Sequence, residues 1–242
     1  MRLFGILNGI DYESYNPETD PNLAYNYSKD TLEERKENKQ LLRQKFNLPD
    51  KDVPLLCIIS RLTDQKGFGL LFDMADPLFK NLDFQLITLG GGDGSFVDFF
   101  RQLSEKYPDK MAGHFTFDTT LSRLILGSAD MILIPSKYEP SGLTQIEAMR
   151  YGVVPIARRT GGLADSVVDY NPKTNTGTGF VFNDFDSYAF YGSIVRALET
   201  HKHTKIWQTL QKRIMTADFS WGHSAKEYLE LFDKALRFHK ER

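Results

Sequence analysis

Cysteine is almost missing from this sequence of 242 residues, which contains only Cys57. A single cysteine excludes an intramolecular disulfide framework and a cysteine-rich zinc site. Cys57 lies inside the apolar run 55–59, so we predict that it is a small core residue. The histidines show no metal-ligand spacing apart from His201 and His203, which flank a lysine in a polar stretch. We therefore expect no metal and no cofactor, and the cysteine usage is typical of a reducing compartment.

Long apolar runs and an excess of basic residues are also missing. No apolar run approaches the roughly 20 residues that a membrane-spanning helix needs, and the first residues do not form a signal peptide. The formal net charge of −2 argues against a nucleic-acid-binding protein, which usually carries a basic stripe. We expect a cytoplasmic protein whose partners include neither nucleic acid nor a membrane.

Short apolar runs alternate regularly with helical patterns from residue 53 onward. Continuous apolarity within the runs is typical of strands that are buried on both faces, and strand–helix alternation predicts parallel strands with right-handed crossovers. The predicted fold class is α/β, a Rossmann-like doubly wound parallel sheet with helices on both faces, ending in extra helices after residue 186. The predicted strands are 54–60, 84–89, 114–117, 130–135, 153–157 and 179–182. The predicted helices between them are 67–79, 95–107, 119–128, 143–151 and 163–170.

The first 27 residues do not resemble the start of such a domain. Residues 12–27 are rich in Tyr, Asn and Pro and have almost no periodicity, which indicates a long, ordered connection. A charged helix is predicted over 28–46. The sequence therefore divides into a connecting segment, 1–27, and a domain, 28–242.

Two carboxylates, Glu139 and Glu147, flank a small-residue turn where a predicted strand leads into a helix. In a parallel sheet this junction lies at the carboxyl edge, where ligands bind. Gly142 allows close approach, and the free N–H groups of Gly142, Leu143 and Thr144 favour an anion. A carboxylate beside an anion site is explained by a sugar, whose hydroxyls donate hydrogen bonds, attached to a diphosphate. The turn therefore predicts a nucleotide-sugar site.

Other loops at the same predicted edge carry cations, glycines and an aromatic residue. Arg61 and Lys66 follow the first strand, and a diphosphate between them would offset their repulsion; the alternative is two solvated cations, one paired with Asp64. Phe117, placed at the end of the third strand, packs in the core by default or stacks on a base. The glycine-rich turn 90–94 allows a ligand or another backbone segment to come close, or is a plain turn. The second glycine turn, 158–163, binds an anion or faces a partner domain, or is a plain turn.

The motifs together resemble the family of bacterial glycogen synthases and plant starch synthases. The resemblance rests on the long, ordered stretches 60–67, 139–145 and 159–167, supported by 8–11 and 27–33, and covers nearly the whole chain. It implies the carboxyl-terminal half of a GT-B fold, from a retaining glycosyltransferase that moves glucose from ADP-glucose to the non-reducing end of an α-1,4-glucan without a metal. It also implies that 1–27 is an interdomain linker and that 28–242 binds the nucleotide sugar.

The resemblance implies a role for individual residues. Arg61 and Lys66 would hold the diphosphate, Glu139 would bind hydroxyls of the glucose, and these three would act in catalysis. Substrate-binding roles follow for further residues. The backbone N–H groups of Gly142, Leu143 and Thr144 would hold the distal phosphate and the sugar. Phe117 would stack on the adenine, Asn8 would lie near the sugar, and Glu147 would be structural or face the ribose.

Two departures from the family pattern affect the expected activity. Ser141 stands where some members have Cys. The family's opening Lys-Thr-Gly-Gly-Leu motif has no counterpart, which predicts that the amino-terminal acceptor domain is absent and that the chain alone is inactive or nearly so. Two alternatives stay open: a domain of a UDP-glucose-dependent retaining transferase, and a non-catalytic nucleotide-binding module.

Overall fold

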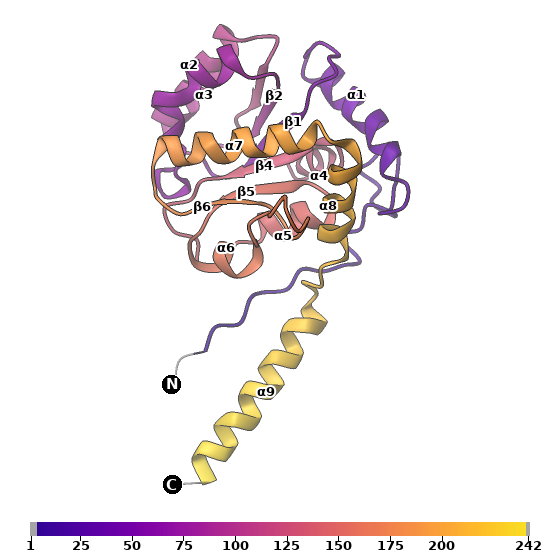
Figure 1. Ribbon diagram of the computed structural model, residues 1–242, viewed down its shortest axis with the longest axis vertical. Coiled ribbons are helices and arrows are strands. Elements are labelled where there is room, and N and C mark those ends of the chain that lie inside the picture. The colour runs from indigo at the N-terminus through magenta and orange to yellow at the C-terminus, as the bar shows by residue number, and fades with distance from the viewer. Residues whose placement is uncertain (1–3, 241–242) are drawn as a thin grey trace.

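Six parallel strands form one sheet in the order β3-β2-β1-β4-β5-β6 (Figure 1). The structure, a computed structural model, describes residues 4–240. The strands are β1 (Leu55–Ile59), β2 (Gln85–Leu89), β3 (Met111–His114), β4 (Met131–Ile134), β5 (Val154–Arg158) and β6 (Phe180–Phe182). Because all neighbouring pairs are parallel and β1 lies beside β4, the predicted doubly wound α/β sheet is confirmed.

Helices connect the strands and cover both faces of the sheet. Before the first strand lies α1 (Arg35–Lys45). Between and after the strands lie α2 (Leu70–Asn81), α3 (Gly94–Lys106), α4 (Thr119–Ser128), α5 (Thr144–Arg150), α6 (Gly161–Ser166), α7 (Ser187–His201), α8 (Thr204–Thr216) and α9 (Trp221–Lys240). Two short 3-10 helices, η1 (Leu32–Glu34) and η2 (Asp64–Lys66), precede α1 and α2. No helix in this part of the chain is long and apolar enough to cross a membrane.

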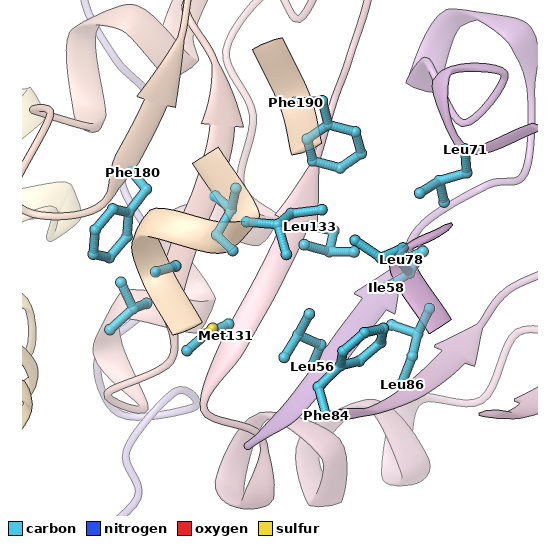
Figure 2. Packing of buried hydrophobic residues seen from close by; sticks show 14 of the residues in the cluster. Leu56, Ile58, Leu71, Leu78, Phe84, Leu86, Met131, Leu133, Phe180 and Phe190 are labelled. Carbon is cyan, nitrogen blue, oxygen red and sulfur yellow. The ribbon is translucent and has the colours of Figure 1, made fainter. Parts of the chain in front are cut away.

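Alternate side chains of each strand enter two separate hydrophobic cores. Leu56 and Ile58 pack with α2, α3 and α7 on one face, as Figure 2 shows for Leu56, Ile58 and Phe190. Leu55 and Cys57 pack with α1 and α4 on the other face. Side chains of successive strand residues point to opposite faces, so burial of both faces explains why the strands read as continuous apolar runs.

The third strand lies earlier than predicted, at Met111–His114 instead of 114–117. Met-Ala-Gly-His has low β-propensity, whereas the following Phe-Thr-Phe has high β-propensity. Residues 115–118 instead form the loop into α4, where the Asp118 side chain caps the helix by accepting a hydrogen bond from the Leu121 N–H at 2.8 Å. The prediction that Phe117 ends a strand is therefore wrong.

The first described residues run as a connection, with an isolated bridge between Ile10 and Ser220. This segment is held to the domain, because the Tyr27 hydroxyl donates to the Tyr151 carbonyl at 2.7 Å and the Ile10 N–H donates to Phe219 at 2.9 Å. At the carboxyl end of the described chain, α9 projects away from the body of the molecule (Figure 1).

Candidate functional site

A pocket lies at the carboxyl ends of β1 and β4. In a sheet of this order, the connections that leave the two central strands diverge, and the crevice between them is where ligands bind. The lining includes Ser60 and Lys66 from the loop after β1, and a larger group from the loop after β4: Ser136, Glu139, Gly142, Leu143, Thr144 and Gln145. The topology therefore brings together segments that are far apart in the sequence.

Lys66 and Glu139 form an ion pair inside this pocket. The Lys66 Nζ lies 2.6 Å from the Glu139 Oε2, and the Ser136 hydroxyl donates to the same oxygen at 3.2 Å. Only 19% of the Lys66 side chain and 11% of the Glu139 side chain are exposed. Asp64 pairs instead with Lys137, at 2.6 Å, so the alternative that placed a cation of this loop on Asp64 is wrong.

Arg61 lies between β1 and η2, next to the lining residue Ser60; it is exposed and does not itself line the pocket. Within residues 4–240 its guanidinium makes neither a hydrogen bond nor an ion pair with another side chain or carbonyl. An exposed guanidinium two positions beyond the end of β1, on the same loop as Lys66, can bind an anion that enters the pocket.

The turn at Gly142 leaves its N–H groups unused. Gly142 has a φ of 70°, a left-handed conformation that favours glycine. The Gln145 side chain donates to the carbonyls of Ser141 and Gly142, at 3.3 and 2.8 Å. By contrast, the N–H groups of Gly142, Leu143 and Thr144 donate to no other residue in the described chain. They remain available for an anion or a sugar.

Both glycine-rich turns bring one backbone segment close to another. A Cβ at Gly161 would lie 2.0 Å from the Glu139 carbonyl oxygen, and the Gly162 N–H donates to that oxygen at 3.0 Å. A Cβ at Gly90 would lie 1.8 Å from the Ser60 carbonyl oxygen. The backbone of each turn therefore packs against one loop of the candidate site. The turn at Gly161 supports the loop that carries Glu139, and the turn at Gly90 supports the loop that carries Arg61. Sequence reasoning left this role open, and the paired glycines were its only signal.

Phe117 is 80% exposed in the loop between β3 and α4. The default expectation that it packs in the core is therefore wrong. Its ring lies at the same carboxyl edge of the sheet as Arg61 and Glu139, two strands away from β1.

Glu147 and Asn8 lie outside the pocket. Glu147 is in the first turn of α5, where burial raises its pKa and the neighbouring Tyr15 and Arg123 oppose that rise. Burial and Glu147 in turn raise the pKa of Tyr15 to about 12. Asn8 is exposed on the segment beside α9, where the Ser224 hydroxyl donates to the Leu7 carbonyl at 2.8 Å.

Comparison with known proteins identifies a family that the chain matches. The sequence profile of the family described as glycosyl transferases group 1 matches residues 38–212. A glycogen synthase from Fervidobacterium nodosum is 45% identical over 233 residues, which cover 96% of this chain and 48% of the relative. One from Desulforudis audaxviator is also 45% identical, covering 97% and 47%. The chain thus spans about half the length of the curated relatives it matches.

Solved structures give the same result. The catalytic domain of starch synthase IV from Arabidopsis thaliana, bound to ADP and acarbose, matches with a TM-score of 0.88 and 37% identity, covering 97% of this chain and 49% of that one. Sucrose-phosphate synthase from Thermosynechococcus elongatus, at 22% identity and a TM-score of 0.64, shares the fold. The predicted resemblance to glycogen and starch synthases is confirmed.

Proposed function

The chain belongs to the glycosyl transferases of group 1, and we propose that it is the donor-binding half of an enzyme that transfers glucose from ADP-glucose to the non-reducing end of an α-1,4-glucan, with retention. The observation that carries the proposal is the shielded Lys66–Glu139 pair, bordered by the unused N–H groups of 142–144. A cation and amides suit a diphosphate, and a carboxylate beside them suits sugar hydroxyls.

In this proposal the pair changes partners when the glucose donor binds. Lys66, Arg61 and the turn amides hold the diphosphate, which frees the Glu139 oxygens to accept hydrogen bonds from the glucose. In the transfer, the bond between the anomeric carbon and the diphosphate oxygen breaks, and the oxygen of the acceptor hydroxyl bonds to the same carbon. Negative charge develops on the departing diphosphate, which takes up the proton that the hydroxyl loses. Cations already fixed at that position stabilise the transition state without reorganisation.

We further propose that residues 1–27 are an interdomain linker and that 28–242 form the nucleotide-sugar domain. The other half of the relatives' length would carry the acceptor site. Correct positioning can supply up to about 7–11 kcal/mol of a transfer barrier, so the chain alone should be nearly inactive while still binding nucleotide.

Calorimetric titration of the chain with ADP and then with UDP tests the identity of the nucleotide. Clear ADP binding with little UDP binding is the expected result. A preference for UDP would favour the UDP-glucose-dependent transferase. Failure to bind either nucleotide would contradict the proposal that this half holds the glucose donor by itself.

Substitution of Glu139 tests whether the site serves a sugar. Glu139→Ala should leave ADP affinity unchanged or slightly higher, because Lys66 loses its carboxylate partner, but should weaken ADP-glucose. Lys66→Ala should weaken both ligands about 10- to 150-fold, because a charge-assisted hydrogen bond contributes about 1.5–3 kcal/mol. An equal loss of both ligands in Glu139→Ala would instead support a non-catalytic nucleotide-binding module. Melting temperatures of both variants serve as the folding control.

A further inference from the structure

The order of the strands places the groups of the proposed donor site in a row along the carboxyl edge of the sheet. Phe117 follows β3, Arg61 and Lys66 follow β1, and Glu139 follows β4. If the proposed function holds, the base, the diphosphate and the glucose lie along the edge in that order. The row ends at β4, and the part of the edge formed by β5 and β6 (Figure 1) lies beyond the glucose.

Exposed aromatic side chains lie at this end of the row, one on the loop after β4 and two after β6. Tyr138, the residue before Glu139, is 59% exposed, and Phe185 and Tyr188, which follow β6, are 37% and 87% exposed. We call these three residues the aromatic rim. Large apolar side chains are costly to expose. Three of them, two on the loops after β4 and β6 and one in the first turn of α7, indicate a ligand surface.

The loops that carry the aromatic rim are packed together. The Phe185 ring centroid lies 5.5 Å from the Lys137 Nζ and 5.4 Å from the Arg158 guanidinium carbon. A Cβ at Gly67 would lie 3.0 Å from the Phe185 Cε2. The loops after β1, β4 and β6 and the last residue of β5 therefore meet at Phe185, and the loop after β4 is also the one that carries Glu139.

Polar groups of both signs surround the aromatic rings. The Lys137 Nζ lies 2.6 Å from both carboxylate oxygens of Asp64, and the Gln65 side-chain amide donates to the Tyr138 carbonyl at 3.4 Å. Lys137 and Arg158 contribute positive charge, and Asp64 with the two neighbours of Phe185, Asp184 and Asp186, contributes negative charge. Because neither sign dominates by more than one charge, the surface favours an uncharged ligand over a phosphate or an acidic peptide. A ligand with apolar faces and many hydroxyls matches aromatic rings flanked by hydrogen-bond donors and acceptors.

We propose that the aromatic rim binds the α-1,4-glucan acceptor, and that this half of the enzyme therefore contributes to acceptor binding as well as to donor binding. Sugar units of the glucan pack on Tyr138 and Tyr188, and Phe185 supports the loops beneath them. A chain seated there leads toward Glu139, so its terminal hydroxyl approaches the glucose from the side of the edge opposite the nucleotide. This inference rests on the proposed function.

Titration of the isotope-labelled chain with maltoheptaose, followed by nuclear magnetic resonance, tests the proposal, because the method detects weak binding. Shifts should concentrate at the amides of 137–139 and 184–188. Tyr138→Ala and Tyr188→Ala should each weaken maltoheptaose about fivefold, by loss of one aromatic contact, and should leave ADP binding unchanged. Phe117→Ala should weaken ADP binding and leave maltoheptaose binding unchanged. Tyr25→Ala, which removes another tyrosine of substantial exposure (44%), should change neither ligand.

The two ligands keep the outcomes distinct. Binding of ADP without maltoheptaose would overturn the rim proposal and leave the donor site standing. Binding of maltoheptaose that is insensitive to both tyrosine substitutions would also overturn it, because the glucan would then bind elsewhere. Rim-dependent binding of maltoheptaose without any nucleotide would support the rim and contradict the proposed donor site.

Discussion

Gly161 matters because it has no side chain. It begins α6 with a φ of 45°, and its α-carbon packs so closely against the Glu139 backbone that there is no room for a Cβ. The neighbouring Gly162 N–H donates to the Glu139 carbonyl. The position of the carboxylate in the pocket therefore depends on two glycines from a loop that does not itself line the pocket.

Gly161→Ala should move this loop. The new Cβ would overlap the Glu139 carbonyl oxygen at 2.0 Å, and alanine is strained at this φ, so we expect a loss of about 1–3 kcal/mol in the free energy of unfolding together with weaker ADP binding. Gly94→Ala is the matched control, because no atom lies within 4 Å of its Cβ. Urea denaturation and calorimetry measure the two effects; an unchanged Gly161→Ala variant would contradict the support role of α6.

Cys57 is a core residue, as the sequence predicted, and it should be chemically inert in the folded protein. It is fully buried in β1, and burial raises the pKa of its thiol well above the usual range. The reactive form is the thiolate, so a thiol reagent should label the chain only after denaturant is added. Rapid labelling of the native chain would show that β1 opens to solvent.

At the scale of single elements, α9 differs from every helix that packs on the sheet. Its apolar residues recur three and four positions apart, as in Ala225, Leu229, Phe232 and Leu236, which places them on one face. Leu229, Phe232 and Leu236 are 63%, 58% and 59% exposed. Nothing within residues 4–240 covers this face, so the isolated chain exposes an apolar stripe.

We expect this stripe to cause association of the isolated chain. Leu229→Lys combined with Leu236→Lys should reduce association at high concentration, measured by sedimentation velocity, without lowering the melting temperature. Glu230→Lys on the charged face is a charge-matched control, since either change takes the formal net charge from −2 to 0. Equal effects of both variants would attribute the association to charge and not to the stripe.

At the scale of the whole molecule, Asp130 joins several elements at the amino edge of the sheet, opposite the candidate site. Its carboxylate accepts from the Leu55 N–H at 2.7 Å and from the Lys39 Nζ at 2.8 and 2.7 Å, and His201 lies 3.7 Å away. These contacts link the start of β4 to β1, α1 and α7. Burial alone would raise the Asp130 pKa, but Lys39, His201 and Arg35 together hold it well below its usual range.

Asp130→Asn should lower the free energy of unfolding at neutral pH by about 3 kcal/mol, because it leaves Lys39 buried without its counter-charge. A depressed pKa contributes stability that is complete above the unfolded-state pKa of about 4 and is lost as the pH falls below it. The difference between the wild type and the variant should therefore shrink below about pH 4. Asp98→Asn, which removes an exposed carboxylate paired with Arg101 on α3, is the control and should change little. A difference independent of pH would contradict the ionic role of Asp130.

The sequence by itself determined the fold class and the edge of the sheet at which the candidate site lies. Parallel strands that are buried on both faces must be continuously apolar, so β1, β2 and β4 were visible from local composition alone. The turns at Gly142 and Gly161 were likewise visible, because left-handed backbone and close packing require glycine at those positions. Only β3, whose Met-Ala-Gly-His sequence has low β-propensity, was misplaced.

Tertiary structure alone decided which side chains meet. Lys66 finds Glu139, 73 positions away, because β1 and β4 are neighbours in the sheet, and no local pattern encodes that adjacency. Local patterns likewise did not predict that Phe117 is exposed. They also did not predict that Glu147 turns toward Tyr15 and Arg123 and not toward the pocket. Side-chain partners depend on strand order and helix orientation, which arise from the packing of the whole chain and not from the spacing of residues along it.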